Sequence, residues 1–147
     1  MKSEPDECSI DHALASPKCI TPWTGVRNYQ ARNTMRDTMR IGDGVLFYHS
    51  SCPEPGIAGL AEVASAAYPD PSQFDRKSPY YDAKSQRSHP RWVCVDVRAL
   101  KKTTLLTLAD LRAHAALAKM WTLRPGNRLS ITPVSATEWK LITGKLL

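Results

Sequence analysis

The stretch RWVCVDVRALKK, residues 91–102, alternates apolar and polar side chains over its first half. This period of two predicts a β-strand, because successive side chains of a strand point to opposite faces of its sheet. The alternate valines from Val93 to Val97 share one face, which we expect in the core. The opposite face, from Trp92 to Arg98, is more polar and is available to line a site.

Further strands are predicted on both sides of this one. VLFYHS, residues 45–50, is rich in branched and aromatic side chains and contains no breaker. GIAGLAEVASAAY, residues 56–68, fits a strand whose Gly56 and Gly59 allow a close backbone approach. LSITPV, residues 129–134, is predicted as one more strand.

Short helices punctuate the strands. Ser9 and Thr107 are typical N-caps for helices in CSIDHALAS and TLADLRAHAAL, and the stretch from Ser135 to Glu138 matches a capping box. NYQARNTMRDTM, residues 28–39, predicts a helix that a turn at residues 41–44 would end. The absence of regular β-α-β alternation favours a mixed α/β (α+β) chain, a small curved sheet or barrel with peripheral short helices.

Length and composition bound the class of protein. The 147 residues fit one domain, residues 1–147. The net charge of +6 favours a polyanionic partner such as nucleic acid. The four cysteines show no metal-ligand spacing, so we expect them reduced and structural. No apolar run is long enough for a membrane span and no signal peptide is recognisable, so we expect a cytoplasmic location.

The stretch PWTGVRNYQARN, residues 22–33, gathers aromatic side chains next to arginines. On a helix beginning near Asn28, Arg32, Arg36 and Arg40 would share one face and could meet phosphate oxygens. Flat aromatics beside arginines suit base stacking combined with backbone contact. A solvated helix face, with the tryptophan of this stretch in the core, explains the same residues equally well.

Patterns for catalysis are weak. The chain contains no G-x-S-x-G, H-E-x-x-H or phosphate-binding loop motif, so we predict no catalytic residue, no metal and no cofactor. His49, at the end of an apolar strand, is expected to be either a polar pocket residue or a hydrogen-bonding residue. Asp70, Asp75 and Asp82 look like turn residues within a long polar loop.

Several blocks of sequence, in this order along the chain, resemble the EVE domain family. The blocks cover nearly the whole chain: MKSEP at 1–5, PWTGVRNYQARN at 22–33, GDGVLFYHSSC at 42–52, GIAGLAEV at 56–63, AYPDPSQFD at 67–75, SPYYD at 78–82, RWVCVDV at 91–97 and RLSITPVSATEW at 128–139.

The resemblance implies a PUA-like fold, which is a small curved β-barrel surrounded by short helices. Related YTH, ASCH and SRA domains bind RNA or DNA, and several hold a modified base in an aromatic-lined pocket. The resemblance therefore implies a non-catalytic module that reads a modified base, such as a modified cytosine in DNA. Two departures concern Met1, which falls inside the family's first strand, and Cys8, which stands where an aromatic is usual. We expect either a start that is misassigned, with residues upstream of Met1, or a shorter first strand.

On this basis we predict a base pocket and a phosphate-binding surface. Alternation within VLFYHS puts Phe47 with His49 on one face and Leu46 with Tyr48 on the other, and one of these faces should be core. The predicted pocket comprises Lys2, Ser3, Trp23, Asn33, Phe47, Tyr48, His49, Ser50, Trp92 and Ser130. The predicted phosphate contacts are Arg27, Asn28, Tyr29, Arg32 and Arg36. Trp121 and Trp139 are expected to pack in the core, and Tyr80 and Tyr81 either cover the pocket or anchor a turn.

Two alternatives stay open. An RNA-binding PUA-like module would share the fold and nearly every residue. An enzyme acting on a base or nucleotide would need a general base, for which His49 or Asp96 is the first candidate.

Overall fold

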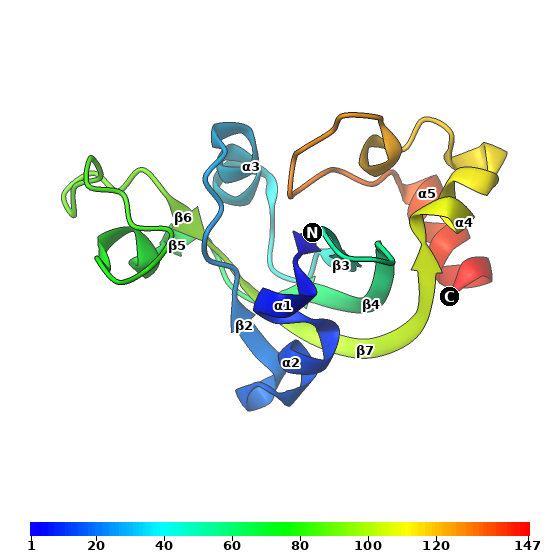
Figure 1. Ribbon diagram of the computed structural model, residues 1–147, viewed down its shortest axis with the longest axis horizontal. Helices are drawn as coiled ribbons and strands as arrows, with labels where there is room; N and C mark the ends of the chain where they lie inside the picture. Colours follow the sequence, from blue (N-terminus) through cyan, green and yellow to red (C-terminus); the bar gives the residue numbers. More distant parts are fainter.

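A curled five-stranded sheet forms the centre of the protein, in a computed structural model that describes all residues 1–147. The strand order is β1-β3-β4-β7-β2, with β1 parallel to β3 and the other pairs antiparallel. The sheet curves into a half-barrel, and the long strand β7 sweeps beneath it from one end of the molecule to the other (Figure 1). The strands are β1 Lys2–Ser3, β2 Ile20–Pro22, β3 Gly44–His49, β4 Gly56–Val63 and β7 Asp96–Thr107.

Short helices surround the sheet, as the sequence predicts. The α-helices are α1 Pro5–Cys8, α2 Ile10–Ala15, α3 Tyr29–Asn33, α4 Leu108–Ala113 and α5 Ala136–Leu141. The 3-10 turns are η1 Pro17–Cys19, η3 Pro71–Phe74, η4 Ala115–Leu117 and η5 Trp121–Leu123, and the π-helical turns are η2 Thr34–Thr38 and η6 Ile142–Leu146. A separate two-stranded pair, β5 Tyr68–Pro69 and β6 Val93–Cys94, lies beside α3 at one end (Figure 1). None of these helices combines the length and the apolar composition that a membrane-spanning helix requires.

The predicted caps are confirmed. Ser9, Thr107 and Ser135 each accept a hydrogen bond from the backbone N–H three residues later and form capping boxes. The predicted close approach in β4 is also confirmed, because a Cβ at Gly59 would lie 2.5 Å from Cδ1 of Ile10. This fit lets α2 pack directly on the sheet.

The curvature of the sheet comes from irregular pairing. Register shifts interrupt the ladder between Phe47 and Tyr48 in β3 and at two points along β4. Such bulges increase the twist of a strand locally. Both faces of the bent sheet are buried, each against a different part of the chain.

The core therefore has two halves. Val45 and Phe47 belong to a cluster with Ile10 and Met35, whereas Leu46 and Tyr48 belong to a second cluster with Leu111. The prediction that only one face of β3 is core is wrong, since Val45 to Tyr48 are all buried. The second layer is supplied by residues 111–142, far along the chain.

Three further predictions are corrected. Residues 129–134 form no strand; the backbone N–H of Lys2 donates to the carbonyl of Ser130 at 2.7 Å, but one such bond makes no ladder. The helix in residues 28–39 ends at Thr38 and finishes with a π-helical turn, so Arg40 lies beyond it and the four-residue repeat of arginines is lost. Trp121 is 37% exposed rather than packed in the core.

Candidate functional site

A polar hollow of about 1090 Å³ opens between the N-terminal segment, the β2–α3 connection and the segment at residues 127–130. These segments are distant in sequence, and the fold places them around one opening. Seven of the predicted site residues line it: Lys2, Ser3, Trp23, Arg27, Asn28, Ser50 and Ser130. The hollow therefore brings together five of the ten predicted base-pocket residues and two of the predicted phosphate contacts, Arg27 and Asn28.

The wall formed by residues 23–28 is held in place by Asp70. This carboxylate has no exposed surface and accepts hydrogen bonds from the backbone N–H of Gly25 at 2.8 Å and from Arg27 Nη1 at 3.0 Å. It also accepts from the backbone N–H and the hydroxyl of Ser72. Burial raises the pKa of Asp70, but the hydrogen bonds from Ser72, Gly25 and Arg27 outweigh it and hold that pKa below its usual range. Asp70 is thus a structural anion as well as the N-cap of η3.

Arg27 is committed to the same network. Its five N–H groups donate to Asp70, Ser72, the carbonyl of Val26 and, twice, the carbonyl of Tyr80. A guanidinium has five N–H donors, so none is left for a phosphate. Although Arg27 lines the hollow, its geometry makes it the tie between the 23–28 wall and the loop that carries Tyr80.

The floor of the hollow is aromatic. Trp23 lines the hollow but is only 7% exposed, and its ring meets that of Phe47 edge to face at 5.4 Å between centroids. Phe47 is fully buried and meets His49 in turn at 5.8 Å. Phe47 therefore packs directly on Trp23, and neither Phe47 nor His49 lines the hollow.

Polar groups surround this floor. The Oδ1 atom of Asn28 caps α3 by accepting from the N–H of Ala31 at 3.1 Å, and its amide N–H₂ makes no hydrogen bond within the protein. The hydroxyls of Ser50 and Ser130 are likewise without an internal partner, whereas that of Ser3 donates to the carbonyl of Cys8 at 2.8 Å. Asn28, Ser50 and Ser130 can thus serve a ligand without losing internal bonds.

The other predicted residues lie elsewhere. Tyr29 is 52% exposed and stacks on Trp92 at 4.9 Å, outside the hollow. The indole N–H of Trp92 donates to Asp82.

Arg32 donates to Asn33 and to the carbonyl of Arg91 at 3.1 Å, and Arg36 pairs with its neighbour Asp37. Tyr48 lies on the opposite face of β3, against the second core cluster.

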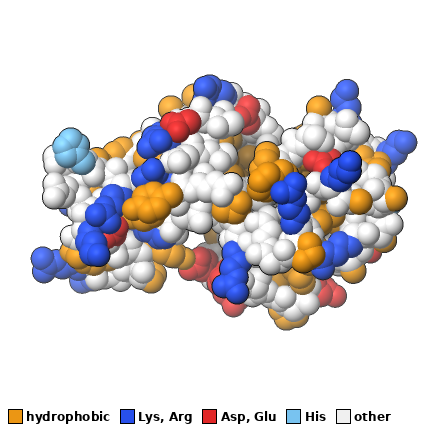
Figure 2. Space-filling model, turned by 90° about the horizontal axis from the view of Figure 1, so that it is seen from above, with side chains coloured by type: hydrophobic (Ala, Val, Ile, Leu, Met, Phe, Trp, Pro, Cys, Tyr) orange, Lys and Arg blue, Asp and Glu red, His pale blue; other side chains and the backbone are white.

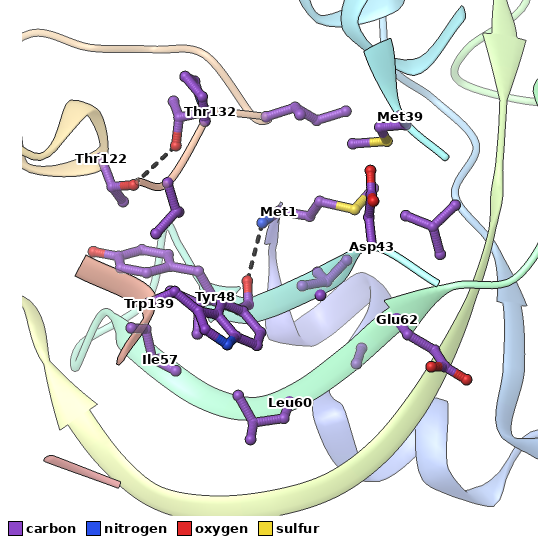
Figure 3. Close-up of a pocket in the computed structure, with 18 of the residues that line it drawn as sticks. Met1, Met39, Asp43, Tyr48, Ile57, Leu60, Glu62, Thr122, Thr132 and Trp139 are labelled. Carbon is purple, nitrogen blue, oxygen red and sulfur yellow. Dashed lines mark hydrogen bonds between the residues drawn. The ribbon is translucent and has the colours of Figure 1, made fainter. Parts of the chain in front are cut away.

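Tyr48 lines a second, largely apolar cavity of about 800 Å³ on that opposite face. Figure 3 shows Tyr48, Trp139, Ile57 and Leu60 around it, with the Thr122 and Thr132 hydroxyls 2.8 Å apart on its far side. Trp139 packs closely on β3 here, because a Cβ at Gly44 would lie 2.5 Å from its ring. Of the predicted pocket residues, only Lys2 and Tyr48 line this cavity. Lys2 also lines the polar hollow, whereas Tyr48 does not.

Groups that could act as a general base are engaged internally. Nε2 of His49 accepts from the backbone N–H of Ile10 at 3.1 Å, and burial lowers the pKa of His49. Asp96 accepts from the hydroxyl of Tyr68 at 2.6 Å. No group of three or more His, Cys, Asp or Glu side chains is arranged to hold a metal ion, and all four cysteines are unbridged.

Two residues outside the predicted pocket set also line the hollow: Tyr80, which was expected either to cover the pocket or to anchor a turn, and Arg128. Tyr80 lines the hollow from the long loop, with its hydroxyl bonded to Glu7 of α1, which raises the pKa of Tyr80 to about 12. Arg128 lines the opposite rim, is exposed and forms no ion pair. Its position at the start of the RLSITPVSATEW block was the one available signal.

Comparison with known proteins places this geometry in context. The profile of the EVE domain family matches residues 1–145. Human thymocyte nuclear protein 1 is 41% identical over 159 aligned residues, which cover 97% of this chain and 70% of the human protein.

Solved structures agree closely. A crystal structure of a Pseudomonas putida protein has a TM-score of 0.92 and 45% identity, covering 98% of this chain and 95% of the other. The human THYN1 protein, solved in complex with 5-methylcytosine-containing DNA, has a TM-score of 0.92 and 39% identity, covering 98% of this chain and 94% of that one.

Proposed function

The chain belongs to the EVE domain family, and from that premise we propose that it is a non-catalytic DNA-binding module whose polar hollow holds a modified base, with 5-methylcytosine as the first candidate. The observation that carries the proposal is the convergence of Trp23, Asn28, Ser50 and Ser130 on one opening. The close structural likeness to a human protein solved with 5-methylcytosine-containing DNA supports the choice of ligand.

A base inside the duplex cannot reach a recessed hollow, so the target nucleotide would leave the stack and enter it. Flipping a base costs a few kcal/mol, and stacking on an aromatic side chain returns roughly 1–3 kcal/mol. Trp23 supplies the aromatic floor and Tyr80 an aromatic group at the rim. The free amide of Asn28 and the hydroxyls of Ser50 and Ser130 are the groups that would read the polar edge of the base.

Discrimination between cytosine and 5-methylcytosine should be modest under this proposal. One methyl group in an apolar contact is worth about 1–3 kcal/mol, which corresponds to roughly 10–200-fold in affinity. A 5-hydroxymethyl group adds a hydroxyl that needs its own hydrogen-bond partner, which the serine hydroxyls could provide.

The proposal excludes chemistry on the base. His49 supports it in this respect, because its Nε2 lone pair accepts from Ile10 and its ring packs edge to face on Phe47 and does not line the hollow. A modified nucleotide recovered unchanged after prolonged incubation is the expected result. Conversion of the base, lost in His49→Gln, would replace this proposal with the enzymatic alternative.

Fluorescence anisotropy with short duplexes containing cytosine, 5-methylcytosine or 5-hydroxymethylcytosine at one position, plus a matched RNA, tests the ligand. We expect tighter binding to a modified duplex. Asn28→Ser keeps a capping oxygen for α3 but removes the amide, so it should reduce binding of the modified probe. Gln30→Ser, which removes an exposed amide of α3 outside the hollow, should not.

Trp23→Phe is the second informative variant, because it keeps an aromatic core residue over Phe47 while shrinking the floor. Its preference for the modified duplex should fall, with thermal melting used to confirm that the variant is folded. Equal, salt-sensitive binding of all probes by the wild-type protein would overturn the pocket proposal. Tighter binding of the RNA would favour the RNA-binding alternative.

A further inference from the structure

The rim of the polar hollow carries opposite charges on different sides. One basic side, the α3 flank, consists of residues 28–40 and 71–91 and holds eight Lys and Arg against three Asp and Glu, a net charge of +5. The other, the 119–128 flank, holds three Lys and Arg and no acidic residue. Together the flanks carry eleven of the twenty Lys and Arg side chains of the protein.

The third side of the rim is acidic. Residues 4–11, which include α1, carry four Asp and Glu and no Lys or Arg. Glu4 and Glu7 from this segment line the hollow. A polyanion at the opening would be repelled along this side and attracted along the other two.

Each basic flank presents an arginine on an exposed aromatic ring. Arg32 lies over Tyr29 at 4.6 Å from the ring centroid, and Tyr29 is 52% exposed. Arg124 lies over Trp121 at 4.0 Å, and Trp121 is 37% exposed. An arginine held over a ring in this way keeps its orientation at the surface, where it can meet phosphate oxygens.

Both flanks are tied to the hollow by direct contacts. On the α3 side, Arg27 binds the carbonyl of Tyr80 and lies 5.4 Å from the ring of Trp92, on which Tyr29 stacks. On the other side, Asn127 lines the hollow and donates to the carbonyl of Trp121 at 2.8 Å. The arginine-aromatic pairs therefore stand on either side of one opening.

The key cations of the flanks are not neutralised within the protein. Arg32, Arg87, Arg124 and Arg128 form no salt bridge, in contrast to Arg27, whose guanidinium pairs with Asp70. Seen from above, Lys and Arg side chains lie on both ends of the molecule, with hydrophobic side chains exposed among them (Figure 2). Unpaired guanidiniums on two sides suit the two stretches of backbone that flank a flipped nucleotide.

From this arrangement we infer that duplex DNA lies across the mouth of the hollow, its backbone held by the α3 flank on one side and by the 119–128 flank on the other, with the acidic α1 side left uncovered. The inference rests on the proposed function for its partner, but it assigns the two activities to different residues. The flanks supply affinity that is independent of the base, and the hollow supplies discrimination.

Paired substitutions test the two flanks separately. The variants are Arg32→Gln with Arg87→Gln on the α3 flank, and Arg124→Gln with Arg128→Gln on the other. Binding of the cytosine and 5-methylcytosine duplexes is measured by anisotropy over a range of salt concentrations. Each phosphate contact contributes about 0.9 to the slope of log K against log salt, so each pair should lower the slope by about 2 for both duplexes.

Two controls make the result specific. Lys101→Gln removes an exposed, unpaired cation of β7, outside the lining of the hollow, and should leave the slope unchanged. Glu4→Gln removes a charge from the acidic side. It should not weaken binding at any of the salt concentrations. Melting temperatures show that every variant remains folded.

The outcomes separate this inference from the proposed function. An unchanged slope in either pair, with a retained preference for the methylated duplex, overturns the two-sided arrangement and spares the pocket. Reduced slopes in both pairs, without any preference in the wild-type protein, support the flanks and overturn the pocket. Failure to bind any duplex overturns both.

Discussion

The carboxylate of Asp70 lies 3.0 Å from the guanidinium of Arg27 and is itself completely buried, while the Arg27 side chain is 21% exposed. This pair joins the 23–28 wall of the hollow to the loop that begins after β5. The same carboxylate holds the backbone N–H of Gly25. The shape of the hollow therefore depends on a charge pair whose arginine has all its N–H groups bonded within the protein.

Replacing Asp70 by alanine should destabilise the protein strongly. The change leaves Arg27 without its counter-ion and removes the acceptor for the N–H groups of Gly25 and Ser72. Removing one partner of a buried pair costs about 3–5 kcal/mol in the free energy of unfolding. Because Arg27 is partly exposed, we expect about 3 kcal/mol, measured by urea denaturation at pH 7.

Asp37→Ala is the matched control for this prediction. Asp37 also pairs with an arginine, Arg36 at 2.8 Å, but both side chains are about half exposed. Exposed pairs contribute little to stability because solvent screens them. The two variants should therefore differ clearly, and equal stabilities would show that the Arg27–Asp70 pair does not hold the fold together.

Gly25 should tolerate no side chain. Its φ of +85° is a left-handed conformation, and a Cβ would lie 2.7 Å from the ring of Tyr80. Gly126 has a φ of +73° but nothing within 4 Å of its Cβ position, so it isolates the conformational part of the cost. Gly25→Ala should be less stable than Gly126→Ala by about 1–3 kcal/mol, the usual cost of overpacking.

The DNA affinity of the same variants gives an independent check. In Gly25→Ala, displacement of Tyr80 changes the rim of the hollow. The folded variant protein should therefore show a smaller preference for a modified duplex over an unmodified one. Gly126→Ala should keep that preference. Equal stabilities of the two alanine variants would mean that the contact between Gly25 and Tyr80 is not close in solution.

Interactions between near neighbours were predictable from the sequence. The caps at Ser9, Thr107 and Ser135 join residues three positions apart, so their pattern is visible in the chain itself. The same is true of the strand at β3, where branched and aromatic side chains are continuous. The glycine at position 59 also predicted a close approach, although not that α2 would be the partner.

Interactions between distant residues were not predictable in this way. Arg27 is predicted as a phosphate ligand because the sequence does not reveal the acceptors that occupy its five N–H groups. Two of these acceptors belong to Asp70 and Tyr80, which are more than 40 positions away. Tyr48 is predicted at the pocket because the strand pattern does not show that a second apolar layer covers its face of β3. That layer comes from residues beyond 110. Trp121 looked like a core residue because its apolar neighbours in sequence are buried while its own ring lies under Arg124 at the surface.

His49 should make the stability of the protein fall as the pH drops below about 6.5. Burial is the largest cause that lowers its pKa; Lys102 acts in the same direction and Asp11 against it. Protonation would also place an N–H on Nε2, where Ile10 already donates at 3.1 Å. The folded-state pKa therefore lies below the unfolded value of about 6.5, so the unfolded state binds the proton first. Stability is complete above pH 6.5 and declines as the pH falls through that value.

Urea denaturation of the wild-type protein and His49→Gln at pH 7.5 and pH 5.5 measures this effect. The glutamine carbonyl can still accept from Ile10 and does not titrate, so the variant should lose less stability than the wild type on acidification. His89→Gln, a change at an exposed histidine, should behave like the wild type. If His49→Gln and the wild type lose the same stability between the two pH values, His49 is not the group responsible, and its hydrogen bond to Ile10 does not constrain its protonation.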